Sequence, residues 1–153
     1  MAKESSGLLL YRHVETSLQF LLVHPGGPFW KNKDLGAWTI PKGELRPGED
    51  PLAAAQREFE EELGFSLTGN FVPLTPIKQK SGKLVRAWAI QGNCDPGLIR
   101  SNTFKLEWPP RSGQFQEFPE IDRADFFDLQ AARTKINPAQ IPFLEELAAK
   151  LKA

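Results

Sequence analysis

Acidic residues crowd one short stretch of the chain, between Glu49 and Glu62. Its fourteen positions hold six acidic side chains and one arginine. Like charges three or four residues apart on a helix repel each other by roughly 0.2–0.5 kcal/mol per pair. This repulsion indicates that a cation sits among the carboxylates in the working protein. We expect a divalent metal ion with a phosphate chain attached to it.

Local signals predict that most of this stretch is a helix over about 51–63. Asp50 is a good N-cap, and Pro51 suits the first helical position. Gly64 is well placed to end the helix. The residues before it, 42–49, are expected to form a loop. The acidic stretch is therefore predicted to be a loop followed by a helix.

The predicted helix has two separate faces. Glu58, Glu61 and Glu62 share one stripe at about 100° per residue. Mg²⁺ prefers oxygen ligands, usually a few carboxylates with waters and substrate phosphates. Bound divalent metals lower the pKa of a water, and a carboxylate not fully used as a ligand can take its proton. We therefore expect water to attack phosphorus in a diphosphate linkage. The second face is apolar and should pack on a sheet, with Leu52, Ala55, Phe59 and Leu63.

The rest of the chain is expected to supply strands and two further helices. Apolar runs at 6–12 and 18–24 predict a β-hairpin, and 37–40 predicts a short strand. We also expect strands at 71–80, 83–91, 98–108 and 124–129, a loop through 109–119, and helices at 130–136 and 138–151. Several strands with separated helices predict a sheet covered by helices on both faces.

Composition limits the classes of protein to consider. At 153 residues the chain is expected to be one domain, 1–153. The 19 basic residues balance 19 acidic ones, which argues against a nucleic-acid coat or a polybasic membrane anchor. The one cysteine, Cys94, allows no internal disulfide. No apolar run suits a signal peptide or a membrane span, so a cytoplasmic location is the default expectation.

The residues from Gly43 to Phe65 resemble the Nudix box, G-x5-E-x7-R-E-U-x-E-E-x-G-U, where U is a bulky apolar residue. Both U positions are phenylalanine here. The resemblance implies an α/β (α+β) fold, a Nudix-like α/β/α sandwich with a mixed central sheet. It also implies a pyrophosphohydrolase that acts on phosphoric anhydrides. Every fixed position of the box is present: Gly43, Glu49, Arg57, Glu58, Glu61, Glu62 and Gly64.

The resemblance also implies roles for the box residues. Glu61, Glu62 and the carbonyl of Gly43 would bind Mg²⁺, with Mn²⁺ as the alternative ion. Glu58 would be a ligand or the base. Arg57 and Glu49 would form an ion pair that holds the loop against the helix.

A further metal ligand often comes from outside the box in this family. The candidates are Glu117 and Glu120. Glu120 is favoured because it stands a few residues before the predicted strand at 124–129, where relatives carry their ligand.

Cationic and aromatic side chains should meet the rest of the substrate. Lys42 is the first choice for a phosphate contact because it immediately precedes Gly43. Lys80 and Arg86 are further candidates, and Trp30 could stack on a base. The remaining candidates are Lys78, Lys83 and Arg111 for phosphate, and Phe29, Trp38 and Trp88 for stacking.

The identity of the substrate stays open. The stretch from Trp38 to Gly43 resembles the W-x-x-P-K-G pattern of the diadenosine-polyphosphate-like branch, and the whole chain resembles bacterial NTP pyrophosphohydrolases. That branch tends to carry a tyrosine after the box, whereas the only tyrosine here is Tyr11. Nucleoside triphosphates, dinucleoside polyphosphates and nucleotide sugars all remain candidates. The alternatives to an enzyme are a Nudix-fold nucleotide sensor and a structural interaction domain, and a homodimer is possible.

Overall fold

The centre of the molecule is a mixed β-sheet. The computed structural model describes residues 3–152. Across this part of the chain, the sheet has the order β4-β6-β1-β2-β9, with β3 beside β1 and β5 beside β6. Strands β1 and β2 are antiparallel, whereas β1 and β6 are parallel, so the predicted mixed sheet is confirmed. The strands are β1 (Glu4–Val14), β2 (Ser17–Pro25), β3 (Lys42–Glu44), β4 (Val72–Pro73), β5 (Ile77–Lys78), β6 (Leu84–Gln91) and β9 (Ile121–Asp128).

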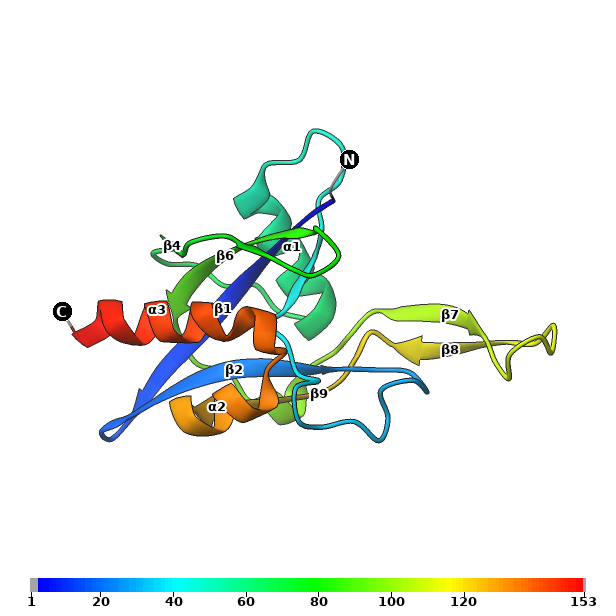
Figure 1. Cartoon of the computed structure of the whole chain (residues 1–153). Helices are drawn as coiled ribbons and strands as arrows, with labels where there is room; N and C mark the ends of the chain where they lie inside the picture. The colour runs from blue at the N-terminus through cyan, green and yellow to red at the C-terminus, as the bar shows by residue number, and fades with distance from the viewer. Residues whose placement is uncertain (1–2, 153) are drawn as a thin grey trace.

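Helices cover both faces of the sheet, as expected (Figure 1). Helix α1 (Pro51–Leu63) packs on one face, while α2 (Leu129–Lys135) and α3 (Ile141–Lys152) pack on the other. Side chains alternate along β1, so Leu8 and Leu10 join the α1 side and Leu9 joins the α3 side. Both sides are closely packed and buried. None of the helices within residues 3–152 is long and apolar enough to cross a membrane.

Helix α1 has the predicted bounds and caps. The Asp50 carboxylate accepts a hydrogen bond from the Ala53 backbone at 3.1 Å. Gly64 ends the helix with a left-handed φ of 86°, and its backbone N–H donates to the Glu60 carbonyl. Phe59 and Leu63 are buried in the core, so the apolar face packs on the sheet as expected. These contacts fix the orientation of the acidic face.

A two-stranded arm projects from the body (Figure 1). It consists of β7 (Thr103–Glu107), β8 (Phe115–Pro119) and the residues that join them. The predicted loop through 109–119 was therefore wrong in its second half. Strand β8 has a polar composition because it pairs with β7 and not with the buried sheet, so its sequence does not have the apolar pattern of a core strand.

Three other expectations need correction near the site. Residues 37–40 form no regular strand, because Trp38 and Thr39 make only isolated bridges. The expected loop at 42–49 begins with strand β3, which pairs with β1. The predicted strand at 71–80 is split into β4 and β5. Prolines at 73 and 76 cannot donate to the neighbouring strand, which accounts for the split.

The last helix begins with a short 3-10 turn, η2 (Pro138–Gln140), and continues as α3. Gln140 is fully buried, and its side chain accepts hydrogen bonds from the Ile40 backbone and the Thr39 hydroxyl, both at 3.0 Å. Residues 39 and 40 lead directly into β3. The start of the C-terminal helix therefore anchors the segment that enters the acidic site.

Candidate active site

Strand β3 brings Gly43 directly against helix α1. The carboxylate of Glu58 occupies the space where a side chain at position 43 would stand, so a Cβ there would collide with it. Glu58 is itself half-buried. The site needs glycine here for space, since its backbone does not have a positive φ.

Arg57 joins the loop before α1 to the helix. Its Nε and Nη2 donate to the two carboxylate oxygens of Glu49 at 2.8 and 2.9 Å, and Nη2 also donates to the Glu44 carbonyl at 3.2 Å. The expected pair between Arg57 and Glu49 is therefore present in bidentate form. These hydrogen bonds from the guanidinium lower the pKa of Glu49 to about 2.

The same guanidinium also reaches the acidic face of α1. Its Nη1 donates to Glu58 at 2.8 Å and to Glu61 at 3.2 Å. Burial raises the pKa of Glu58, although Arg57 opposes that shift. Arg46 adds a contact of 3.4 Å to Glu61. Two of the three carboxylates on the acidic face of α1, those of Glu58 and Glu61, are thus held by arginine.

Glu62 is the most buried carboxylate of the site, with 6% of its surface exposed. Its Oε2 atom is buried and has no hydrogen-bond partner among the described residues. Burial raises the pKa of Glu62 well above its ordinary value, and the negative charges of Glu58 and Glu120 add to the shift. A buried carboxylate oxygen without a donor is costly, so this position calls for a cation or a proton.

Glu120 completes the acidic group from the other end of the chain. It lies between β8 and β9. Burial raises its pKa, and the charges of Glu58 and Glu61 add to the shift. Glu117 lies on β8 opposite Lys105, in an exposed position. The structure therefore brings Glu120, rather than Glu117, to the acidic face of α1.

The donor set suits a hard divalent cation. It offers the carboxylates of Glu58, Glu61, Glu62 and Glu120, including the Glu62 oxygen to which no described residue donates a hydrogen bond. Within residues 3–152, no three acidic, histidine or cysteine side chains already converge in a metal-binding geometry. Glu58 and Glu61 are turned toward Arg57 instead. An ion bound here would have to take these two carboxylates from the guanidinium.

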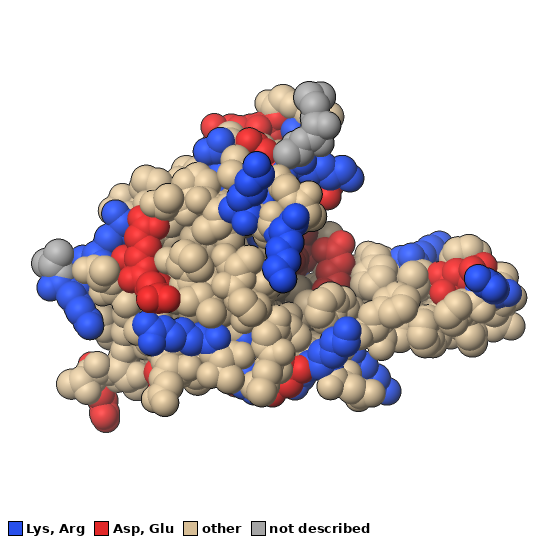
Figure 2. Space-filling view, in the orientation of Figure 1, with Lys and Arg blue, Asp and Glu red and all other residues tan. Residues whose placement is uncertain are grey.

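Near the acids, the basic side chain of Lys42 lies on the face of the sheet opposite α1. Lys42 pairs with Gly7 and Gly43 pairs with Ser6, so the Lys42 side chain points away from α1. Burial lowers the pKa of Lys42, and the charge of Lys83 adds to this effect. Figure 2 shows basic side chains over the β5–β6 turn and acidic side chains recessed between that turn and the arm. Positive charge therefore borders the acidic recess.

A pocket opens beside this basic region. It lies between the β5–β6 turn and η2, and its volume of about 360 Å³ is in the range of small-molecule sites. Lys80 is exposed on its rim. Its other lining residues are Gln79, Ser81, Asn137, Pro138 and Ala139.

The remaining candidates are spread over several surfaces. Arg86 pairs with Glu4 at 3.5 Å on the α1 side, away from Lys42. Trp30 is exposed in the loop after β2, and Arg111 lies at the tip of the arm. Trp38 is buried, with its indole N–H donating to Asp34, which favours a position in the core over stacking on the substrate. The others have ordinary positions: Lys78 is exposed on β5, Lys83 pairs with Glu44, and Trp88 packs against the core on the α1 side.

Sequence reasoning missed three residues of this region. Arg46 contacts Glu61, and Asn102 donates its backbone N–H to the Glu61 carbonyl at 2.9 Å. The Trp108 ring contacts the Phe29 ring edge to face. Arg46 could have been noticed as the basic residue inside the box loop. The other two depend on the position of the arm, which no local pattern of residues predicts.

Comparison with known proteins agrees with this architecture. The NUDIX domain family model matches residues 5–147. A bis(5′-nucleosyl)-tetraphosphatase of Caenorhabditis elegans is 39% identical over 66 residues, which are 43% of this chain and 44% of that protein. The rat protein of the same name is 32% identical over 100 residues, 58% of this chain and 64% of that protein. These matches cover less than two thirds of either relative.

The fold also resembles a solved structure, that of an Ap4A hydrolase of C. elegans in a binary complex. The TM-score is 0.65 at 23% identity, over 97% of this chain and 98% of the other. At this level of identity the likeness concerns the fold alone. The match to the family model, by contrast, spans nearly the whole chain and includes the acidic loop and helix. The chain belongs to the NUDIX domain family.

Proposed function

We propose that this protein is a Mg²⁺-dependent pyrophosphohydrolase that cleaves a diphosphate linkage in a nucleoside polyphosphate. The observation that carries the proposal is Glu62, a buried carboxylate whose Oε2 has no hydrogen-bond partner in the described part of the chain and whose pKa is raised further by the charges of Glu58 and Glu120. Such a cluster is costly to bury without a cation. The similarity to two bis(5′-nucleosyl)-tetraphosphatases supports a nucleoside polyphosphate as the substrate.

Three carboxylates and one carbonyl would hold the ion, and Glu58 could add a fourth carboxylate. Glu61, Glu62 and the Gly43 carbonyl are the proposed ligands from the box, and Glu120 is the outer ligand. When bound, Mg²⁺ would neutralise the phosphates and make a water more acidic. Glu58 either joins the ligands or accepts the proton of the attacking water. Glu58 lies against Gly43 and accepts a hydrogen bond from Arg57, which it would have to release in order to join the ligands.

The basic side of the recess would bind the phosphate chain. Lys42 is half-buried beside the acids, so its ammonium can approach a phosphate with little competition from water. Lys80 lies on the rim of the pocket near η2, which is large enough for a nucleoside. Arg86 is engaged by Glu4 on the other side of the sheet and is a weaker candidate.

A substrate panel tests the proposal. Purified protein is incubated with ATP, diadenosine tetraphosphate and a nucleotide sugar, with Mg²⁺, with Mn²⁺ or with a chelator. We expect phosphate-containing products that form only with a divalent metal. Binding of these nucleotides without turnover under every metal condition would contradict the proposal and would support a sensor.

A further inference from the structure

An aromatic cluster on the arm and on the loop after β2 has no part in the proposed cleavage. The arm pairs Phe104 with Phe118, and Trp108 follows at the far end of β7. Side chains alternate along a strand, so these three rings share one face of the arm. The loop after β2 covers that face. Gly27 lies against Phe104, and the Phe29 ring meets the Trp108 ring edge to face, with centroids 5.5 Å apart.

This cluster leaves a large aromatic surface open to solvent. Phe29 is 60% exposed even though it contacts Trp108, and the neighbouring Trp30 is 40% exposed. The same loop carries Lys31 and Lys33, and the Lys33 ammonium lies 5.1 Å from the Trp30 ring. An open aromatic face bordered by positive charge suits a nucleobase attached to phosphate, because bases stack on such rings.

Hydrogen bonds fix the cluster relative to the acidic site. The Asn102 N–H donates to the Glu61 carbonyl at 2.9 Å, and the Glu120 N–H donates to the Asn102 carbonyl at 2.8 Å. The loop after β2 is held in the same way, since the Gly26 N–H donates to the Glu120 carbonyl at 2.9 Å. Buried His24 also contacts the Lys33 carbonyl at 2.6 Å. The base of the arm and the base of the loop are thus hydrogen-bonded to the backbone of two proposed metal ligands, Glu61 and Glu120.

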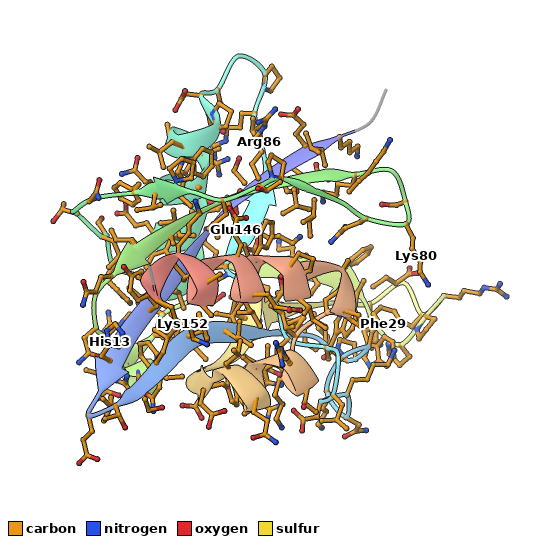
Figure 3. All side chains as sticks on the ribbon, turned by 60° about the vertical axis from the view of Figure 1, so that its left-hand side comes forward. His13, Phe29, Lys80, Arg86, Glu146 and Lys152 are labelled. Atoms are coloured by element: carbon orange, nitrogen blue, oxygen red, sulfur yellow. The ribbon has the colours of Figure 1, made fainter. Side chains whose placement is uncertain are left out.

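The separation between the aromatic cluster and the acidic site indicates which kind of ligand could reach both. Strand β7 leads from Asn102, beside Glu61, to Trp108. At about 3.4 Å per residue, the backbone of Trp108 lies roughly 20 Å along the arm from that of Asn102. A base that reaches them while a linkage is cut at the acids must be joined to that linkage through several phosphates. Figure 3 places Phe29 at the same end of the molecule as Lys80, far from His13 and Lys152.

We propose that Phe29 and Trp108 form a stacking platform for the second nucleobase of a dinucleoside polyphosphate. This inference rests on the proposed function, because it assumes that the phosphate chain is cut at the acidic site. The platform determines specificity and takes no part in the chemical step. It gives dinucleoside polyphosphates an advantage over nucleoside triphosphates, which carry only one base.

Replacement of Phe29 by alanine tests the platform. The side chain is mostly exposed, so the variant should fold like the parent. We measure kcat/KM with Mg²⁺ for diadenosine tetraphosphate and for ATP. One stacked base contributes about 1–3 kcal/mol, so kcat/KM for the dinucleotide should fall about 5- to 140-fold, with no change for ATP. A Trp108→Leu variant should show the same pattern.

Phe115→Ala is the matched control. Phe115 is 67% exposed on the arm, but it pairs with Glu107 and so lies on the face opposite Trp108. Phe115→Ala should leave kcat/KM unchanged for both diadenosine tetraphosphate and ATP. Equal losses for both substrates in Phe29→Ala, or no loss, would overturn the inference. A parent protein that cleaves ATP but not diadenosine tetraphosphate would overturn the inference and leave the proposed function standing. A parent protein that cleaves neither ATP nor diadenosine tetraphosphate would overturn both the inference and the proposed function.

Discussion

At the scale of single residues, Arg57 organises the acidic stretch. One guanidinium binds Glu49 with two hydrogen bonds and also reaches Glu58 and Glu61. It therefore offsets the repulsion between like charges on α1 and holds the preceding loop. Glu62 is not among its partners and stays buried, with one oxygen that accepts no hydrogen bond from residues 3–152. Arg57 therefore neutralises part of the acidic cluster, while the Glu62 part still needs a cation.

The ion pair between Arg57 and Glu49 should make stability depend on pH. The folded protein lowers the pKa of Glu49 from its ordinary value of 4.5 to about 2. A carboxylate with a lowered pKa stabilises the fold above its ordinary pKa, and this contribution is lost as the pH falls from about 4.5 toward 2. Glu49→Gln should therefore unfold at lower urea concentration than the parent at pH 7.

The pH series supplies the control for this prediction. Other carboxylates titrate in both proteins, so only the difference in free energy of unfolding reports on Glu49. That difference should shrink as the pH is lowered below about 4.5. A difference that stays constant from pH 7 to pH 3, or equal stability at pH 7, would show that the pair does not stabilise the fold.

At the scale of elements, β3 and α1 meet at Gly43. A methyl group at this position would collide with the Glu58 carboxylate, which is the flexible end of a side chain and can move. Gly43→Ala should therefore keep the fold while displacing Glu58. A displacement of about 1 Å in an active site can cost about 100-fold in rate, so we expect a loss of that order in kcat.

Two measurements on Gly43→Ala separate these effects. The melting temperature should stay close to that of the parent, while turnover of the best substrate from the panel falls. Parent-like turnover would mean that Glu58 does not need its position against β3. A large drop in melting temperature would instead indicate that the methyl group disturbs the packing of β3 on α1.

The C-terminal helix supports the site from a distance through Gln140. Its buried side chain satisfies the Ile40 backbone N–H two residues before Lys42. Gln140→Ala would leave that N–H unpaired, which costs about 1–3 kcal/mol. We expect this loss in the free energy of unfolding measured with urea. Gln130→Ala, at an exposed position on α2, should show no comparable loss.

At the scale of the whole molecule, the sequence predicted what depends on local pattern. Helix α1 has its expected bounds because Asp50, Pro51 and Gly64 act within a few residues of the helix ends. The two faces of α1 followed from its period. Helices on both faces of a mixed sheet are also confirmed.

What the sequence did not predict depends on contacts between distant segments. Strand β3 is three residues long and exists because it pairs with β1, and β8 exists because it pairs with β7. The burial of Glu62 depends on how α1 packs against the sheet, and the closeness of Glu120 depends on where the arm returns to the body. A short stretch of sequence cannot show which distant segments will pair with it or bury it.

The central claim is that the acidic face of α1 performs metal-dependent cleavage. The most direct test compares the parent, Glu62→Gln and Glu60→Gln in Mg²⁺-dependent hydrolysis of the best substrate from the panel. Glu60 is exposed on the same helix, so its variant is a matched control. We predict that Glu62→Gln keeps the melting temperature of the parent and loses about 100-fold or more in kcat, while Glu60→Gln stays at the parent rate. Turnover by Glu62→Gln at the parent rate would contradict the account.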